Sequence, residues 1–216
     1  YDTIIWEVEN NIKWETCPEC VSPDAFSKAE FKEILAYSRQ LGLEPIPLLQ
    51  TIGHCEFVLK HERYKPLAEV PDRIDQYCPR NPDVVAFLRK WIDEYLDLFG
   101  PVRYFHLGAD EAYTLGECPR CRAYAAEHSL SELYIDHINA VFTAPADFVS
   151  YTRVGLRVNR MGYKVAAGAD EQASDLTLGE LSIGDGLKAV IVFVLCPRAE
   201  LPARESLRAR AARQGL

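Results

Sequence analysis

Asp110 and Glu111 are the residues of this sequence whose types and spacing best suit acid–base chemistry. The β-rich run 102–107 ends just before them, and in parallel α/β proteins the carboxyl ends of the strands form the active face. Adjacent residues of a regular strand point to opposite sides, so both carboxylates can serve one site only where the strand gives way to a loop. Gly108 favours such a break. The alternative is a solvated acidic loop, because Asp-Glu pairs are common.

Two adjacent carboxylates can divide the work of a reaction between them. A general acid at neutral pH needs a raised pKa, which partial burial and a neighbouring carboxylate both favour, whereas a stabilising partner must remain ionised. We expect His54 and His106 near the same face, where they could hydrogen-bond the carboxylates, hold their rotamers and tune the proton balance. The alternative for each histidine is a structural hydrogen bond in the core or in a loop.

Two segments of the sequence carry a family resemblance. Residues 53–60 read Gly-His-Cys-Glu-Phe-Val-Leu-Lys, and residues 106–111 read His-Leu-Gly-Ala-Asp-Glu. In this order and at this separation they resemble glycoside hydrolase family 20, the β-N-acetylhexosaminidases, and most of all the hexosaminidase D-like branch. The resemblance covers about residues 1–141.

The resemblance implies a (β/α)8 barrel enzyme that removes terminal N-acetylhexosamine from a glycan or glycoconjugate with retention of configuration. In this family the substrate's own 2-acetamido oxygen attacks the anomeric carbon, so the enzyme supplies no nucleophile and catalysis requires no cofactor. By position, Glu111 would be the general acid and base. Asp110 would orient the acetamido group and stabilise the charge that develops on its nitrogen. We group His54 and His106 with this catalytic pair.

Further acidic and aromatic side chains could reach the same rim and bind substrate. An aromatic face can stack on the apolar C–H surface of a sugar ring. Solvated loop positions for the carboxylates and ordinary packing for the aromatics are the alternatives. The candidates are Glu7, Glu9, Asn10 and Glu56 at the rim, and Tyr113 and Trp14 for stacking.

Two Cys-x-x-Cys pairs form a second constellation among the seven cysteines of the chain. Each pair follows a strand that contributes to the active face, so the two loops could converge and present four thiolates tetrahedrally to zinc. Such a zinc site would be structural, because four cysteines leave no open position for catalysis. Disulfides and unpaired thiols are the alternatives. The predicted ligands are Cys17, Cys20, Cys118 and Cys121.

The elements that must position these residues alternate between strand and helix. Ser27 and Glu30 form a capping box, and Asn81-Pro82 pairs an N-cap with a proline at the first helical position. Trp91 falls on an apolar helical stripe and is expected in the core. Strands are expected at 3–8, 43–50, 102–107, 164–167 and 188–195, and helices at 28–41, 82–99 and 132–142.

This alternation implies parallel strands with right-handed crossovers, hence an α/β fold. With the resemblance, the fold class is the (β/α)8 TIM-barrel type, as an incomplete barrel of about strands 2 to 6, because a minimal barrel needs about 200 to 250 residues. The family's arginine that grips sugar hydroxyls would precede Tyr1. All three tryptophans precede Asp110, so the tryptophans that line the family's acetamido pocket lack counterparts. The chain by itself could therefore be inactive.

Composition sets the remaining bounds. The formal net charge of −8 and the pI near 5.2 leave no broad cationic surface, which argues against nucleic acid and acidic membranes as partners. No apolar run approaches the ~18 residues that span a bilayer. We expect that sequence before Tyr1 has been removed, and the cysteine pattern favours a cytoplasmic location over secretion.

We divide the chain into a catalytic barrel portion, residues 1–143, and a divergent continuation of the barrel, residues 144–216. The continuation ends in an Ala/Arg-rich tail that we expect to be poorly structured. A competing hypothesis is a carbohydrate-binding or zinc-stabilised interaction module, derived from such a barrel, that has no catalytic activity.

Overall fold

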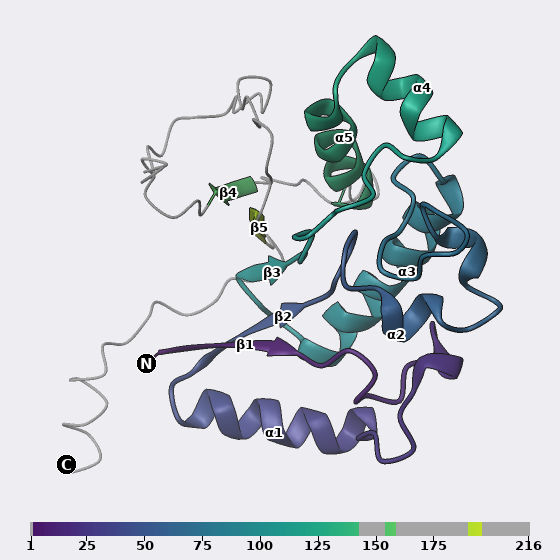
Figure 1. Cartoon of the computed structure of the whole chain (residues 1–216). Coiled ribbons are helices and arrows are strands. Elements are labelled where there is room, and N and C mark those ends of the chain that lie inside the picture. Colours follow the sequence, from purple (N-terminus) through teal and green to yellow (C-terminus); the bar gives the residue numbers. More distant parts are fainter. Residues whose placement is uncertain (1, 143–153, 159–189, 196–216) are drawn as a thin grey trace.

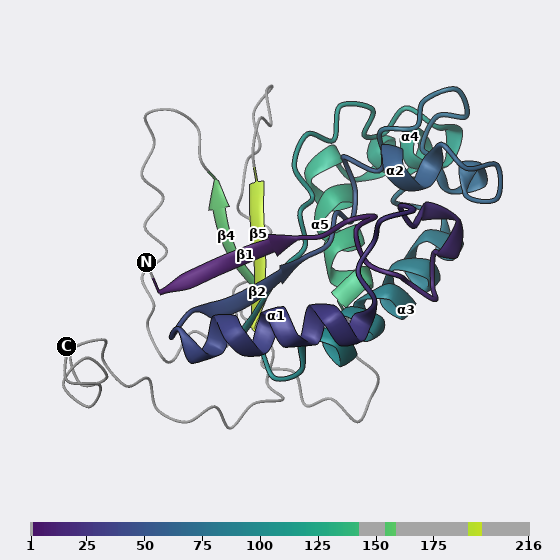
Figure 2. The same cartoon turned by 90° about the horizontal axis from the view of Figure 1, so that it is seen from below.

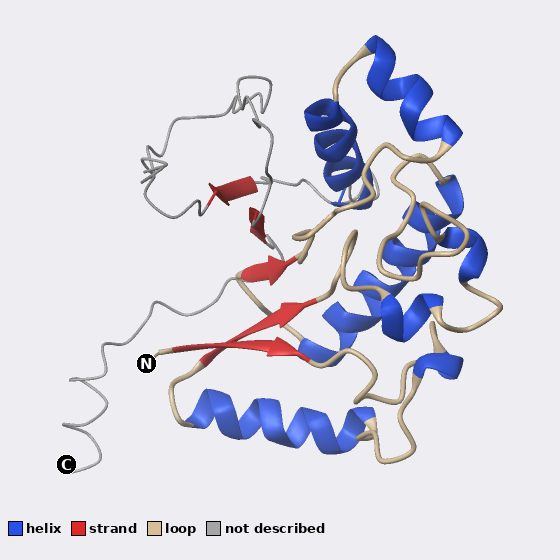
Figure 3. Cartoon of the chain, in the orientation of Figure 1, coloured by secondary structure: helices blue, strands red, loops and turns tan. Residues whose placement is uncertain are grey.

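A parallel sheet forms the centre of the computed structural model, which describes residues 2–142, 154–158 and 190–195 (Figure 1). Its parallel strands are β1 (Thr3–Glu7), β2 (Glu44–Leu48) and β3 (Tyr104–His106), in that order across the sheet. Leu48 lies opposite both Glu7 and His106, so the three strands end in one row. A loop leaves the carboxyl end of each strand at this edge (Figure 3). The predicted parallel order is confirmed for these three strands.

Two further strands extend the sheet beyond β3. β5 (Val190–Leu195) pairs antiparallel with β3, and β4 (Val154–Val158) pairs antiparallel with β5. The strand expected at 188–195 is thus present, whereas the strand expected at 164–167 lies outside the described residues. This antiparallel pair departs from the all-parallel order of a (β/α)8 barrel. The side of β3 that faces away from β2 offers N–H and C=O groups that can pair with a strand of either direction.

Two predicted helices connect the parallel strands. α1 (Lys28–Gln40) joins β1 to β2, and the reciprocal Ser27–Glu30 capping box is present at its start. α3 (Pro82–Phe99) joins β2 to β3, and the Asn81 side chain accepts the N–H of Asp83 at its N-terminus. α1 packs against β2 and α3, and α3 packs against α5 (Leu130–Phe142), which matches the third predicted helix (Figure 2).

Shorter helices lie in the loops between these elements. α4 (Pro119–Glu127) carries the same signature as α3, a capping side chain followed by proline at the first position, but it was not predicted from the sequence. Among the described residues no helix is long and apolar enough to cross a membrane. The short helices are η1 (Pro18–Cys20), α2 (Glu56–Leu59), η2 (Lys65–Leu67) and α4 (Pro119–Glu127).

An aromatic core lies where α3 meets the sheet. Trp91 is fully buried, as its helical spacing predicted, and packs edge-on against Trp14. Tyr95 stacks on Trp14 and Phe99 and contacts Phe105 of β3 edge-on. Rings of this size bury a large apolar area each, so α3 anchors β3 and the loop that follows it.

Candidate active site

The loops that follow β2 and β3 run side by side. The Leu49 N–H donates to the carbonyl oxygen of His106 at 3.0 Å. The Thr51 N–H and hydroxyl both donate to the carbonyl oxygen of Leu107, at 3.1 and 2.6 Å. Strand-like pairing thus continues beyond the ends of β2 and β3, and it fixes how the two loops meet.

Left-handed backbone follows β3 over several residues. The φ angle is +62° at Gly108, +71° at Ala109 and +53° at Glu111, and His54 in the neighbouring loop has φ +54°. Non-glycine residues adopt this conformation uncommonly, and such residues cluster at functional sites. The predicted break in the strand is therefore present. It removes the alternation that would send Asp110 and Glu111 to opposite faces.

His54 joins the two carboxylates. Its Nε2 lies 3.5 Å from Oδ2 of Asp110 and 3.3 Å from Oε2 of Glu111. All three side chains are between 33% and 41% exposed, so solvent and a ligand can reach them. His54 thus bridges the two carboxylates and fixes their orientation relative to each other.

Glycines allow the two loops to approach this closely. A Cβ atom on Gly53 would lie 2.2 Å from the backbone oxygen of Asp110. A Cβ atom on Gly108 would lie 2.0 Å from Oε1 of Gln50. From the sequence, Gly53 stood out only as part of a motif. Its close approach to the Asp110 backbone could not be predicted, because that backbone lies more than fifty residues away in the sequence.

His106 is buried and supports the loop that carries the carboxylates. Its Nδ1 accepts the N–H of Gly108 at 2.9 Å, which requires that nitrogen to be unprotonated. Burial lowers the pKa of His106, and the negative charges of Asp110 and Glu7 oppose this effect. The imidazole is therefore favoured in its neutral form, which suits the bond to Gly108. A catalytic role for His106 stays a prediction.

A cavity of about 530 Å³ opens beside the carboxylates, a volume within the usual range for small-molecule sites. Acidic side chains dominate its lining, and the Gln50 side chain donates to Glu7 at 2.7 Å. Burial raises the pKa of Glu9, and the charges of Glu7 and Glu56 raise it further. Gln50 and Phe57 were not predicted here. The lining residues are Glu7, Glu9, Gln50, His54, Glu56, Phe57 and Asp110.

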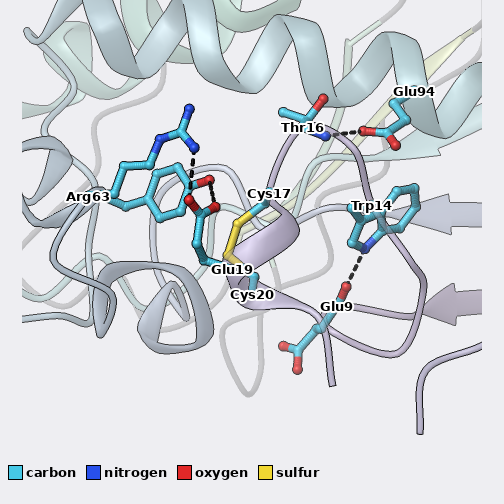
Figure 4. The surroundings of a disulfide bond; sticks show 9 residues. Glu9, Trp14, Thr16, Cys17, Glu19, Cys20, Arg63 and Glu94 are labelled. Atoms are coloured by element: carbon cyan, nitrogen blue, oxygen red, sulfur yellow. Dashed lines mark hydrogen bonds and ion pairs between the residues drawn. A yellow bond between two sulfur atoms is a disulfide. The ribbon is translucent and has the colours of Figure 1, made fainter. Parts of the chain in front are cut away.

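Trp14 does not belong to the cavity, and the expectation that it stacks on substrate is wrong. The ring is 2% exposed and stacks on Tyr95, with 4.3 Å between the ring centroids. Its indole N–H donates to the carbonyl oxygen of Glu9 (Figure 4). Trp14 is buried because α3 presents an aromatic surface to it, so its role is to hold the backbone that carries Glu9.

Tyr113 is 62% exposed and lies beside the Asp110–Glu111 carboxylate pair. A hydrogen bond with the Glu111 carboxylate raises the pKa of Tyr113, because the carboxylate favours the protonated phenol. The ring is therefore free to contact a ligand, and stacking on a sugar stays a prediction.

The predicted zinc site of four cysteines is wrong in its ligands. Cys17 and Cys20 are joined by a disulfide across η1, which is one of the alternatives that the spacing allows (Figure 4). Glu19 between them accepts hydrogen bonds from Arg63 and Tyr64, and these lower its pKa to about 2.

The second cysteine pair lies in another group. Cys118 and Cys121 meet Cys78 and Glu69, and one ligand atom from each lies within 4.8 Å of all the others. We call these four residues the cysteine cluster. Its donor atoms could hold a metal ion. The sequence analysis missed Glu69 and Cys78 because neither belongs to a Cys-x-x-Cys pair and tertiary folding alone brings them to α4.

The site thus combines three parallel strands, a carboxylate pair in the loop after β3 and an acidic cavity. The chain belongs to glycosyl hydrolase family 20: the catalytic-domain model of that family matches residues 8–153. Structures of this family are TIM barrels, and the three parallel strands of this chain form a part of such an α/β arrangement.

Relatives agree with this assignment. Hexosaminidase D of Bos taurus is 40% identical over 119 residues, which are 54% of this chain and 34% of the relative. Hexosaminidase D of Homo sapiens is 38% identical over 119 residues, which are 54% of this chain and 24% of the relative. The chain thus resembles the hexosaminidase D branch and spans about a third or less of the length of these relatives.

Solved structures share the fold at low sequence identity. The β-N-acetylhexosaminidase of Bacteroides fragilis aligns with a TM-score of 0.53 and 21% identity, over 63% of this chain and 32% of the other. The chitobiase of Flavobacterium johnsoniae aligns with a TM-score of 0.55 and 21% identity, over 65% of this chain and 25% of the other.

Proposed function

We propose that this protein acts as a retaining exo-β-N-acetylhexosaminidase on terminal N-acetylhexosamine of a glycan or glycoconjugate. The observation that carries the proposal is the Asp110–Glu111 pair, joined by His54, with Asp110 and His54 in the lining of an acidic cavity. Membership of family 20 supports the substrate-assisted route, in which the substrate supplies its own nucleophile.

The proposed mechanism gives each carboxylate one task. Glu111 donates its proton to the glycosidic oxygen while the 2-acetamido oxygen attacks the anomeric carbon and the aglycone departs. Asp110 stabilises the positive charge on the acetamido nitrogen of the oxazoline intermediate. Glu111, now ionised, removes a proton from water as that water opens the intermediate, which restores the configuration of the substrate.

The surroundings of the pair support this division. His54 contacts both carboxylates and so orients them relative to each other. Tyr113 beside Glu111 could contact the leaving group or the sugar. Glu7, Glu9 and Glu56 offer acceptors for sugar hydroxyls along the cavity wall.

The test measures hydrolysis of aryl N-acetyl-β-glucosaminides by this chain and by any longer product of its reading frame. Glu111→Gln should lower kcat by about 10²–10⁴ for a poor leaving group and much less for an activated phenol that needs no proton. Asp110→Asn should lower kcat for both. The conservative exchange Glu62→Gln, on an exposed side chain, is the matched control. Full activity of Glu111→Gln with the poor leaving group would contradict the assignment.

A second candidate function is glycan binding without hydrolysis. The observation in its favour is that the lining of the cavity includes Asp110 but not Glu111, the proposed general acid. A thiazoline mimic of the oxazoline intermediate separates the two functions when its binding is measured together with turnover. Binding without turnover in every form of the protein favours the second candidate, and turnover that the thiazoline inhibits favours the first.

A further inference from the structure

The cysteine cluster gathers three thiols and one carboxylate from two separate segments. Glu69 and Cys78 flank a turn in which the Glu69 N–H donates to the carbonyl oxygen of Gln76. Cys118 caps α4, and Cys121 lies in its first turn. Cys78 and Cys121 are fully buried, and Glu69 is 2% exposed.

The sulfur positions have the spacing of a metal site. The Sγ of Cys78 lies 3.6 Å from that of Cys118 and 3.7 Å from that of Cys121. Bonds of about 2.3 Å from a tetrahedral zinc ion place two sulfurs about 3.8 Å apart. A disulfide needs about 2.05 Å. The cluster therefore already has the separations that a shared zinc ion imposes.

Glu69 is placed to supply the fourth ligand. One carboxylate oxygen lies 3.2 Å from the Sγ of Cys121, and the other accepts the N–H of Cys118 at 3.0 Å. Within the part of the chain that the structure describes, no ion pair joins Glu69 to a lysine or arginine. A buried carboxylate without a compensating cation is costly, and a bound metal ion removes that cost.

Hydrogen-bond donors point at two sulfurs of the cluster. The Cys121 N–H donates to the Sγ of Cys118 at 3.3 Å, at the N-terminus of α4. The Arg120 guanidinium approaches the Sγ of Cys78 at 3.8 Å. These contacts hold the sulfurs in place within the cluster.

We propose that Glu69, Cys78, Cys118 and Cys121 bind a structural zinc ion. Thiolate ligands in tetrahedral geometry select zinc over the hard cations magnesium and calcium. Three thiolates and one carboxylate fill all four positions, so this ion takes no part in hydrolysis.

The proposed zinc ion fixes the loops that carry the candidate catalytic residues. From Glu111 the chain reaches Cys118 within seven residues, and on the way the Thr114 N–H donates to the buried Gln76 side chain at 2.9 Å. The turn between Glu69 and Cys78 is in turn bound to the loop after β2, because the Tyr77 N–H donates to the carbonyl oxygen of Ile52. Zinc binding would therefore restrict the movement of both loops that carry the candidate catalytic residues.

The test measures zinc in the full chain, purified without a metal-affinity tag and under reducing conditions. We expect about one zinc ion per chain by plasma emission spectrometry. Cys78→Ser should lose the zinc, and Glu69→Gln should bind it more weakly. The double variant Cys17→Ser/Cys20→Ser removes the other Cys-x-x-Cys pair and should keep the wild-type zinc content. A wild-type chain without zinc after incubation with excess Zn²⁺ overturns the proposal.

Cobalt(II) gives a second readout that needs no variant to fold. Co²⁺ added to the metal-free chain should give thiolate-to-metal charge transfer in the near ultraviolet and strong visible bands of tetrahedral coordination, and Zn²⁺ should abolish both. Weak octahedral absorption, or a disulfide between Cys78 and either partner under reducing conditions, overturns the proposal. Neither measurement uses hydrolysis, so its failure is distinct from failure of the proposed function.

Discussion

The two Cys-Pro-x-Cys segments of this chain have nearly the same sequence and different chemistry. In both, a cysteine stands before a helix that begins at proline. The first helix, η1, ends after three residues and its cysteines form a disulfide. The second, α4, runs for nine residues and its cysteines face Cys78 and Glu69. The motif thus determines the local turn, whereas the residues packed around it determine whether the sulfurs form a disulfide or face other possible metal ligands.

The residue between the cysteines differs as well. Glu19 turns outward to Arg63 and Tyr64 (Figure 4), and Arg120 approaches the sulfur of Cys78. The acid of the first segment is thus bound by a neighbouring cation and phenol, whereas the base of the second segment contacts the cysteine cluster itself.

Loss of one cysteine from each segment should give the largest contrast. Cys121→Ser removes a proposed zinc ligand, so we expect a loss on the order of 4 kcal/mol in the free energy of unfolding, because metal-binding free energy is also folding free energy. Cys20→Ser should cost about 2 kcal/mol, the chain entropy of so short a loop. Urea unfolding with equimolar Zn²⁺ measures both, and equal losses would contradict the contrast.

In the wild-type chain, a zinc chelator and a reductant should each affect only one of the two Cys-Pro-x-Cys segments. A zinc chelator should lower the melting temperature through the second segment and leave the Cys17–Cys20 disulfide intact. A reductant should open that disulfide and lower the melting temperature by about 5 °C, with zinc still bound. Calorimetry with thiol counting and zinc analysis checks both arms. Zinc release by the reductant alone would show that the segments are not independent.

A substitution of Gln76 tests whether the second Cys-Pro-x-Cys segment, unlike the first, is coupled to the candidate active site. Gln76→Leu leaves the buried Thr114 N–H without its acceptor, which should cost about 1–3 kcal/mol of stability. Because Thr114 follows the carboxylate pair, kcat for aryl glucosaminide hydrolysis should fall while zinc stays bound. Gln40→Leu, at the end of α1, is the control and should change neither quantity. Unchanged kcat in Gln76→Leu would separate the cluster from the site.

Glu19 should give the smallest effect, seen in how stability depends on pH in acid. The pKa of Glu19 is lowered to about 2 by Arg63 and Tyr64, so its stabilising contribution is complete above the ordinary glutamate pKa of 4.5. That contribution is lost as the pH falls from 4.5 through about 2. Glu19→Gln should therefore lower the melting temperature slightly at pH 7, and the difference from the wild-type chain should disappear as the pH falls toward 2. An identical acid profile in both proteins would mean that the exposed pair adds nothing.

Much of the fold could be predicted from local signals. The Ser27–Glu30 capping box and the Asn81-Pro82 start define α1 and α3 to within a residue or two, because such signals act within one helical turn. The same reasoning would have found α4 at Cys118-Pro119. The antiparallel direction of β5 had no such signal, since strand direction depends on where the connecting chain runs.

In the candidate site, too, some residues could be predicted from the sequence and others could not. Asp110, Glu111 and His54 were predicted from two motifs, and the structure brings them within ion-pair distance. Trp14 was misassigned because an aromatic residue near a strand end has the same signature in a core as at a rim, and only α3 decides between them.

The sequence by itself determined the order of β1, β2 and β3, the starts of α1 and α3, the family and the carboxylate pair, because each depends on residues within a turn or on a short contiguous motif. Only the tertiary structure decided that Cys17 meets Cys20 while Cys118 and Cys121 meet Glu69 and Cys78. It also decided that Gly53 must lie against the backbone of Asp110. These outcomes depend on contacts between distant segments, and such contacts leave no periodic trace in the sequence.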